Sequence, residues 1–186
     1  MSTSHRPLLL KGPRVCDPSQ DLDARMDVLV EDGTISELGE DLAAPPGARV
    51  VDCSGLWLWP GLVDPHVHFR DPGFTEKEDL RTGGQAAAAG GYTAVVCEPN
   101  TRPPIDTPAR ARELLRRAAS ESAVRVFTKV AMTEGRGGQR MADLEAMNGL
   151  DGVVAASDDG APLVDEGTMD RVCDRAAALD MLLSPH

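Results

Sequence analysis

Two histidines separated by one residue, His66 and His68, stand near the end of an apolar run in the segment DPHVHFRDPG, residues 64–73. Because side chains alternate between the two faces of a strand, both imidazoles would project the same way, with Val67 facing the opposite packing layer. Two such imidazoles can hold one Zn²⁺ ion and leave positions open for water and substrate. The alternative is a pair of surface histidines without a ligand.

Two further polar side chains follow apolar runs and could meet a substrate. Arg70 lies two residues beyond His68, and its planar guanidinium suits bidentate binding of a carboxylate. The alternative is a surface arginine paired with Asp71. Asn100, in CEPNTRPPID, residues 97–106, offers a donor and an acceptor beside a proline-stiffened loop. Its alternative role is to stabilise a turn.

Adjacent carboxylates occur in the segment AASDDGAPLVDEGTMD, residues 155–170, between a short apolar run and a helical pattern. Asp158 or Asp159 could bind a metal ion, and a carboxylate can bridge two ions about 3.5 to 4 Å apart. Asp-Asp-Gly is equally an ordinary turn or a helix cap. The residues alone leave these two interpretations open.

The elements that must position these side chains change in kind near residue 58. The first part has short β-type runs separated by turn-rich segments, at residues 7–15, 26–39 and 48–55. Strand-like runs then alternate with amphipathic helical segments, which is typical of βα units around a parallel sheet. The predicted strands are 58–69, 92–99, 123–132, 152–158 and 181–186, and the predicted helices are 78–91, 107–120, 141–150 and 165–180.

Composition limits the class of protein. The chain has 186 residues, of which 41% are hydrophobic and 3% aromatic, and a net charge of -11. This acidity opposes phosphate backbones and anionic lipid, so we expect neither a nucleic-acid nor a membrane partner. The four cysteines, Cys16, Cys53, Cys97 and Cys173, form no CxxC pair and are predicted to be buried free thiols. Without a signal peptide or membrane span, the sequence predicts a cytoplasmic protein.

The motifs resemble those of a known family. WPGLVDPHVHFRDPG, residues 59–73, is similar to the first barrel strand of the amidohydrolase superfamily, and its FRDPG ending favours dihydroorotase. CEPNTRPPID resembles the PNT-x-P-x-x-D loop of the long, bacterial-type dihydroorotases, which usually have Met where Glu98 stands. The Ser-Asp-Asp-Gly segment that contains Asp159 also resembles that of the family.

The resemblance implies an α/β fold: a small β-sandwich segment, residues 1–58, followed by the first half of a metal-dependent-hydrolase (β/α)₈ barrel, residues 59–186. About four βα units and a fifth strand fit that length, because a whole barrel takes about 250 residues. The chain is therefore expected to be truncated and inactive alone. The aspartate that acts as general acid/base would lie beyond residue 186, so no catalytic residue is expected within the chain.

The resemblance also implies a site with one or two Zn²⁺ ions. Its expected metal ligands are His66, His68, Asp159 and His186, with Asp158 as the second choice for the carboxylate. Its expected substrate-binding residues are His68, Arg70 and Asn100.

The implied activity is the reversible cyclisation of N-carbamoyl-L-aspartate to dihydroorotate in pyrimidine biosynthesis. The whole protein is expected to form a homo-oligomer, with aspartate transcarbamoylase as a possible partner. One alternative is a non-catalytic dihydroorotase-like subunit that scaffolds aspartate transcarbamoylase. Another is an amidohydrolase that resembles a hydantoinase or allantoinase.

Overall fold

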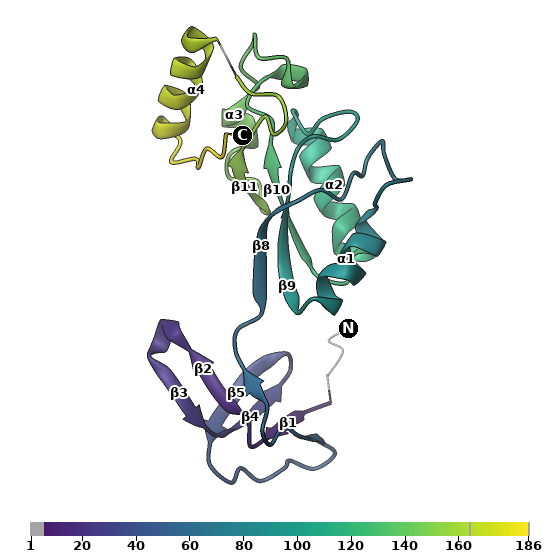
Figure 1. Ribbon diagram of the computed structural model, residues 1–186, viewed down its shortest axis with the longest axis vertical. Coiled ribbons are helices and arrows are strands. Elements are labelled where there is room, and N and C mark those ends of the chain that lie inside the picture. Colours follow the sequence, from purple (N-terminus) through teal and green to yellow (C-terminus); the bar gives the residue numbers. More distant parts are fainter. Residues whose placement is uncertain (1–5, 164, 186) are drawn as a thin grey trace. The chain divides into compact units, whose positions relative to one another are not determined.

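The chain folds into two compact units, Met1–Pro60 and Gly61–His186. The computed structural model describes residues 6–163 and 165–185, and Figure 1 shows their helices and strands. The four α-helices found among these described residues, and a four-stranded parallel sheet, belong to the second unit. The predicted α/β class is therefore confirmed. Within the described residues, no helix combines the length and the apolar character that crossing a membrane requires.

The first unit contains two small mixed sheets. One has the order β5-β4-β1-β6 and the other β3-β2-β7. Their strands are β1 (Leu8–Lys11), β2 (Arg14–Asp17), β3 (Leu22–Arg25), β4 (Asp27–Glu31), β5 (Thr34–Gly39), β6 (Arg49–Asp52) and β7 (Trp57–Leu58). A short 3₁₀ turn, η1 (Pro18–Gln20), joins β2 to β3.

The first unit has few buried apolar side chains. Leu9 on β1 and Val28 on β4 are each 1% exposed, and their strands pair antiparallel. A buried carboxylate ties loops to this sheet: Asp27 accepts hydrogen bonds from Lys11 Nζ at 2.6 Å and from the backbone N–H groups of Gly12 and Leu42. These bonds hold the pKa of Asp27 below its ordinary value.

The second unit is built on a parallel sheet of order β11-β10-β9-β8. Its strands are β8 (Leu62–Val67), β9 (Tyr92–Cys97), β10 (Arg125–Val130) and β11 (Val153–Ala156). Each lies within a run that the sequence predicted as a strand. Because parallel strands run in one direction, the loops after β8, β9 and β11 meet at the same edge of the sheet.

Four helices lie between or after these strands. They are α1 (Leu80–Ala89), α2 (Pro108–Glu121), α3 (Leu144–Met147) and α4 (Glu166–Ala178), with a 3₁₀ turn, η2 (Glu134–Arg136), after β10. The Asp79 side chain caps α1, and Thr107 caps α2 ahead of a proline in its first turn. Both helices lie along the sheet in Figure 1, where α1 contacts β9 and α2 contacts β10.

Apolar side chains from the sheet and the helices form one core in the second unit. Several are completely shielded from solvent, among them Leu80, Val95, Ile105, Val130 and Met147. Only one of these, Met147, comes from the short helix α3. This core fixes the sheet whose ends carry the candidate site.

Three predicted elements are shorter than expected. The helix predicted for 141–150 contains only α3, because Asn148 and Gly149 leave helical geometry and both residue types disfavour a helix interior. The predicted strand 58–69 is interrupted around Pro60, where proline lacks a backbone donor. In the run 181–186, the described residues form a single parallel bridge, from Leu183 to Ala156.

The cysteines are free, as predicted, but their expected burial is wrong for most of them. Cys97 on β9 is buried, and burial raises the pKa of its thiol to about 12. Cys173 is exposed on α4, whereas Cys16 and Cys53 are partly buried in the first unit. Cys173 faces solvent because α4 buries a different stripe that includes Val172 and Ala176.

Candidate metal centre

Three of the predicted site residues meet at the carboxyl edge of the parallel sheet. His66 is near the end of β8, His68 lies just beyond it, and Asp159 follows β11. The two histidine Nε2 atoms are 3.2 Å apart. Asp159 Oδ1 is 3.5 Å from His66 Nε2, and Asp159 Oδ2 is 3.9 Å from His68 Nε2. One ligand atom from each residue lies within 4.8 Å of the other two, so the three could hold one metal ion.

The other nitrogen of each imidazole already has a partner. His66 Nδ1 lies 3.1 Å from Glu98 Oε1, and His68 Nδ1 lies 3.1 Å from Asn100 Oδ1. Asn100 also donates its amide N–H to the Asp159 carboxylate. Metal-binding histidines ordinarily donate their second ring N–H to a carboxylate or carbonyl in this way. Two such imidazoles and one carboxylate match the nitrogen and oxygen donors that Zn²⁺ accepts.

The neighbouring carboxylate, Asp158, is bound elsewhere. Its Oδ1 accepts a hydrogen bond from the backbone N–H of Met132 at 2.8 Å, and Thr133 donates its hydroxyl to Oδ2. Burial raises the pKa of Asp158 above its ordinary value. Asp158 therefore ties the loop after β11 to the end of β10, whereas Asp159 reaches the histidines.

The predicted substrate-binding residues line one open cavity of about 620 Å³ beside the histidines. His68, Arg70, Asn100 and Asp159 all contribute to its wall. Arg70 lies beyond the end of β8, which closes at Val67, and has a left-handed backbone (φ 57°). Arg70 does not pair with Asp71, the partner considered as an alternative, because Arg117 binds both oxygens of that carboxylate.

The comparisons with known proteins show the family of this chain. The family model described as dihydro-orotase-like matches residues 55–186, which include every side chain of the cluster. The chain belongs to the dihydro-orotase-like family.

Curated relatives of this dihydro-orotase-like chain cover almost all of it. It is 46% identical over 179 residues to a dihydroorotase from Citrifermentans bemidjiense, a match to 96% of this chain and 42% of that protein. It is 39% identical, with the same coverage, to a dihydroorotase from Aquifex aeolicus. The chain thus spans less than half the length of these relatives.

Solved structures show the same fold. An L-hydantoinase from Arthrobacter aurescens superposes with a TM-score of 0.81 at 23% identity, covering 96% of this chain and 40% of that one. A D-hydantoinase from Thermus sp. gives a TM-score of 0.72 at 26% identity, with the same coverage.

Several residues of the dihydro-orotase-like site were not identified from the sequence. Arg102 and Arg136 line the same cavity as Arg70, and Arg136 donates to the backbone carbonyl of Asp159. Arg136 is the last residue of η2, in a glycine-rich stretch, and the fold brings it to the cavity. Glu98 and Lys129, which form a buried ion pair beside His66, were likewise not assigned to the site. The proposed ligand His186 lies outside the described residues.

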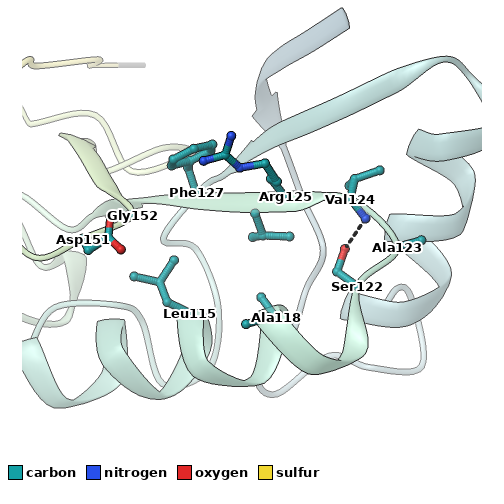
Figure 2. Close-up of a pocket in the computed structure, with 11 residues that line it drawn as sticks. Leu115, Ala118, Ser122, Ala123, Val124, Arg125, Phe127, Asp151 and Gly152 are labelled. Carbon is teal, nitrogen blue, oxygen red and sulfur yellow. Dashed lines mark hydrogen bonds between the residues drawn. The ribbon is translucent and has the colours of Figure 1, made fainter. Parts of the chain in front are cut away.

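A second cavity lies at the opposite, amino-terminal ends of the strands (Figure 2). Leu115 and Ala118 of α2 face the start of β10, and the Ser122 hydroxyl accepts a hydrogen bond from Val124 N. Gly152, just before β11, completes this wall. The side chains there are mostly apolar, and enzymes built on parallel sheets place their chemistry at the carboxyl ends. The polar cavity beside His68 is therefore the candidate site.

Proposed function

We propose that this chain is the metal-binding half of a dihydroorotase, a zinc-dependent enzyme that interconverts N-carbamoyl-L-aspartate and dihydroorotate. The observation that carries the proposal is the cluster of His66, His68 and Asp159 beside an arginine-lined cavity. The family membership and the relatives named dihydroorotase support it.

The proposal includes an architecture. The parallel unit is the first half of a (β/α)₈ barrel, with residues 1–58 as a β-sandwich segment. The alternation of β8 to β11 with helices supports this arrangement. The whole enzyme is proposed to be a cytoplasmic homo-oligomer in pyrimidine biosynthesis that can associate with aspartate transcarbamoylase.

Metal ligation is the first role of the cluster. His66, His68 and Asp159 would hold one or two Zn²⁺ ions, with His186 as a further ligand. Zinc in such a site polarises a carbonyl oxygen and lowers the pKa of water toward about 7. Asn100 would keep His68 and Asp159 in place through the two hydrogen bonds of its amide. The general acid/base aspartate is proposed to lie beyond residue 186.

Substrate binding is the second role. Carbamoyl aspartate and dihydroorotate carry carboxylates, whereas the chain has a net charge of -11. Local positive charge must therefore attract them, and Arg70, Arg102 and Arg136 bring three guanidinium groups to the cavity. Arg70 would bind the substrate carboxylate through its planar fork, with help from Asn100 and His68.

The decisive experiment uses the protein encoded by the complete reading frame that contains these residues, purified with zinc. We expect hydrolysis of dihydroorotate and cyclisation of carbamoyl aspartate, both lost in Asp159→Asn and retained in the matched control Asp158→Asn. The isolated 186-residue chain should show little or no turnover. Turnover of hydantoin or allantoin instead of dihydroorotate would contradict the proposal. Absence of both metal and activity would point to the non-catalytic scaffold.

A further inference from the structure

A buried ion pair stands directly behind the histidine cluster. Glu98 follows β9, and Lys129 is the fifth residue of β10, so neighbouring parallel strands bring them together. The Glu98 side chain is fully buried, and that of Lys129 is only 7% exposed. Removing two charges from water is unfavourable, and their mutual attraction offsets this only when the geometry is good. A packed apolar pair would fill the same volume without that cost.

The contacts of this pair lead to the cluster. Glu98 Oε1 accepts a hydrogen bond from Lys129 Nζ and lies 3.1 Å from His66 Nδ1. Lys129 Nζ also donates to Ser184 Oγ at 2.9 Å. The backbone N–H of Glu98 donates to the Val67 carbonyl, between the two histidines, at 2.9 Å. Glu98 is thus held through its backbone N–H and through Oε1, whereas its buried Oε2 makes no hydrogen bond within the described part of the chain.

We propose that Glu98, anchored by Lys129, is a positioning residue that holds His66 with its hydrogen on Nδ1 and its Nε2 lone pair toward the cluster. The carboxylate oxygen can only accept a hydrogen bond, so the nitrogen that faces it must be protonated. The opposite nitrogen, which is 3.2 Å from His68 Nε2, is then the one available to a metal ion. The inference rests on the proposed metal centre.

Lys129 has a specific part in this arrangement. Its ammonium group donates to the same oxygen, Oε1, that faces His66, and so holds that oxygen beside the ring. Ser184 receives a second hydrogen bond from Lys129 and limits the rotation of the ammonium group. Asn100 orients His68 in the same way, because its amide oxygen faces His68 Nδ1 as the Glu98 carboxylate faces His66 Nδ1. Both imidazoles are therefore oriented by the segment that follows β9.

The test compares two double variants that remove the charge pair together and so avoid a lone buried charge. Glu98→Met/Lys129→Met removes the acceptor that faces His66, whereas Glu98→Gln/Lys129→Met keeps an amide oxygen there. The hydrogen position on His66 is read from ¹⁵N NMR of its ring in the metal-free chain, and zinc affinity from calorimetry. Circular dichroism and thermal melts check that each variant is folded.

We expect His66 to carry its hydrogen on Nδ1 in the wild type and in the Gln/Met variant, and to lose this preference in the Met/Met variant. Zinc affinity should fall about 10- to 100-fold in the Met/Met variant and much less in the Gln/Met variant. A wild-type His66 protonated on Nε2 would overturn the inference, as would unchanged tautomer and affinity in the folded Met/Met variant. Because the tautomer is measured without metal, a wild type that keeps Nδ1–H but binds no zinc would instead count against the proposed metal centre.

Discussion

Two buried carboxylates of the second unit are paired in different ways. Asp71 lies in the loop after β8, and Arg117 of α2 binds its two oxygens at 2.7 and 2.8 Å. Glu98 lies behind the histidines, and its Oε1 is shared between Lys129 and His66. Each Asp71 oxygen has its own guanidinium donor, and Arg117 also binds Glu121 within α2, so this pair continues along the helix. The Glu98 pair continues into the candidate metal centre.

We infer from this difference that the Asp71 pair stabilises the fold, whereas the Glu98 pair also supports the proposed metal centre. The Asp71–Arg117 pair joins the loop after β8 to α2, where Arg117 also binds Glu121. The Glu98–Lys129 pair leaves one contact directed at a proposed ligand. We therefore expect changes to the first pair to affect folding alone, and changes to the second to affect both folding and metal affinity.

The largest effect should come from removing one partner of the Glu98–Lys129 pair. Glu98→Met or Lys129→Met alone should lower the free energy of unfolding by about 3–5 kcal/mol, because either leaves a buried charge without its partner. The double variant should recover most of that loss. Urea unfolding of the three variants measures this. Single variants that cost less than about 1 kcal/mol would mean that the pair is not buried as described.

The neighbouring aspartates Asp158 and Asp159 should differ in their effect on zinc affinity. Asp159→Asn should lower zinc affinity more than roughly 100-fold, because it removes a proposed ligand. Losing a residue that only hydrogen-bonds a ligand lowers the affinity by roughly 10- to 100-fold. Asp158→Asn should change zinc affinity far less, since its oxygens bind Met132 and Thr133. Calorimetric titration of both variants makes the comparison. Equal losses would show that the two carboxylates are not divided in this way.

Removing Arg117 from the Asp71–Arg117 pair should have a smaller effect, and on stability alone. Arg117→Met should destabilise the chain by about 2 kcal/mol, since it removes charge-assisted hydrogen bonds from the buried Asp71 carboxylate. The effect is smaller than for Glu98–Lys129 because Arg117 is 30% exposed and its pair is less desolvated. Zinc affinity should stay at the wild-type value. Parallel urea unfolding and zinc titration would test both statements, and a marked fall in affinity would erase the distinction between the two pairs.

The smallest effect concerns the helix that carries Arg117. Thr107→Ala removes the side-chain cap of α2 and should cost about 1 kcal/mol of stability. Thr107→Ser keeps a hydroxyl and is the matched control. A loss of stability in the Ser variant as large as that in the Ala variant would show that the cap contributes nothing.

Much of this organisation could be predicted from the sequence, because it depends on local patterns. Strand periodicity located β8 to β11, and the one-residue spacing of His66 and His68 indicated a shared ligand face. An apolar run indicated that Asp158 and Asp159 follow a strand, but only the family resemblance favoured Asp159 as the ligand. These signals are local, so a single sequence carries them.

Other features depend on which strands become neighbours. Nothing near Glu98 or Lys129 in the sequence shows that they meet, because 30 residues separate them and only the register of β9 and β10 joins them. Arg136 reaches the cavity from a loop that has no regular pattern. The expected strand at 181–186 failed to extend beyond one bridge among the described residues, since pairing depends on neighbours as well as on composition.

His66, His68 and Asp159 are proposed to hold a common metal ion. Crystals of the protein grown with zinc, with diffraction data collected on both sides of the zinc absorption edge, would locate that ion. We expect an anomalous peak bounded by Nε2 of both histidines and the Asp159 carboxylate, at zinc ligand distances of about 2.0 to 2.2 Å. Zinc bound elsewhere, with these three side chains uncoordinated, would contradict the proposal.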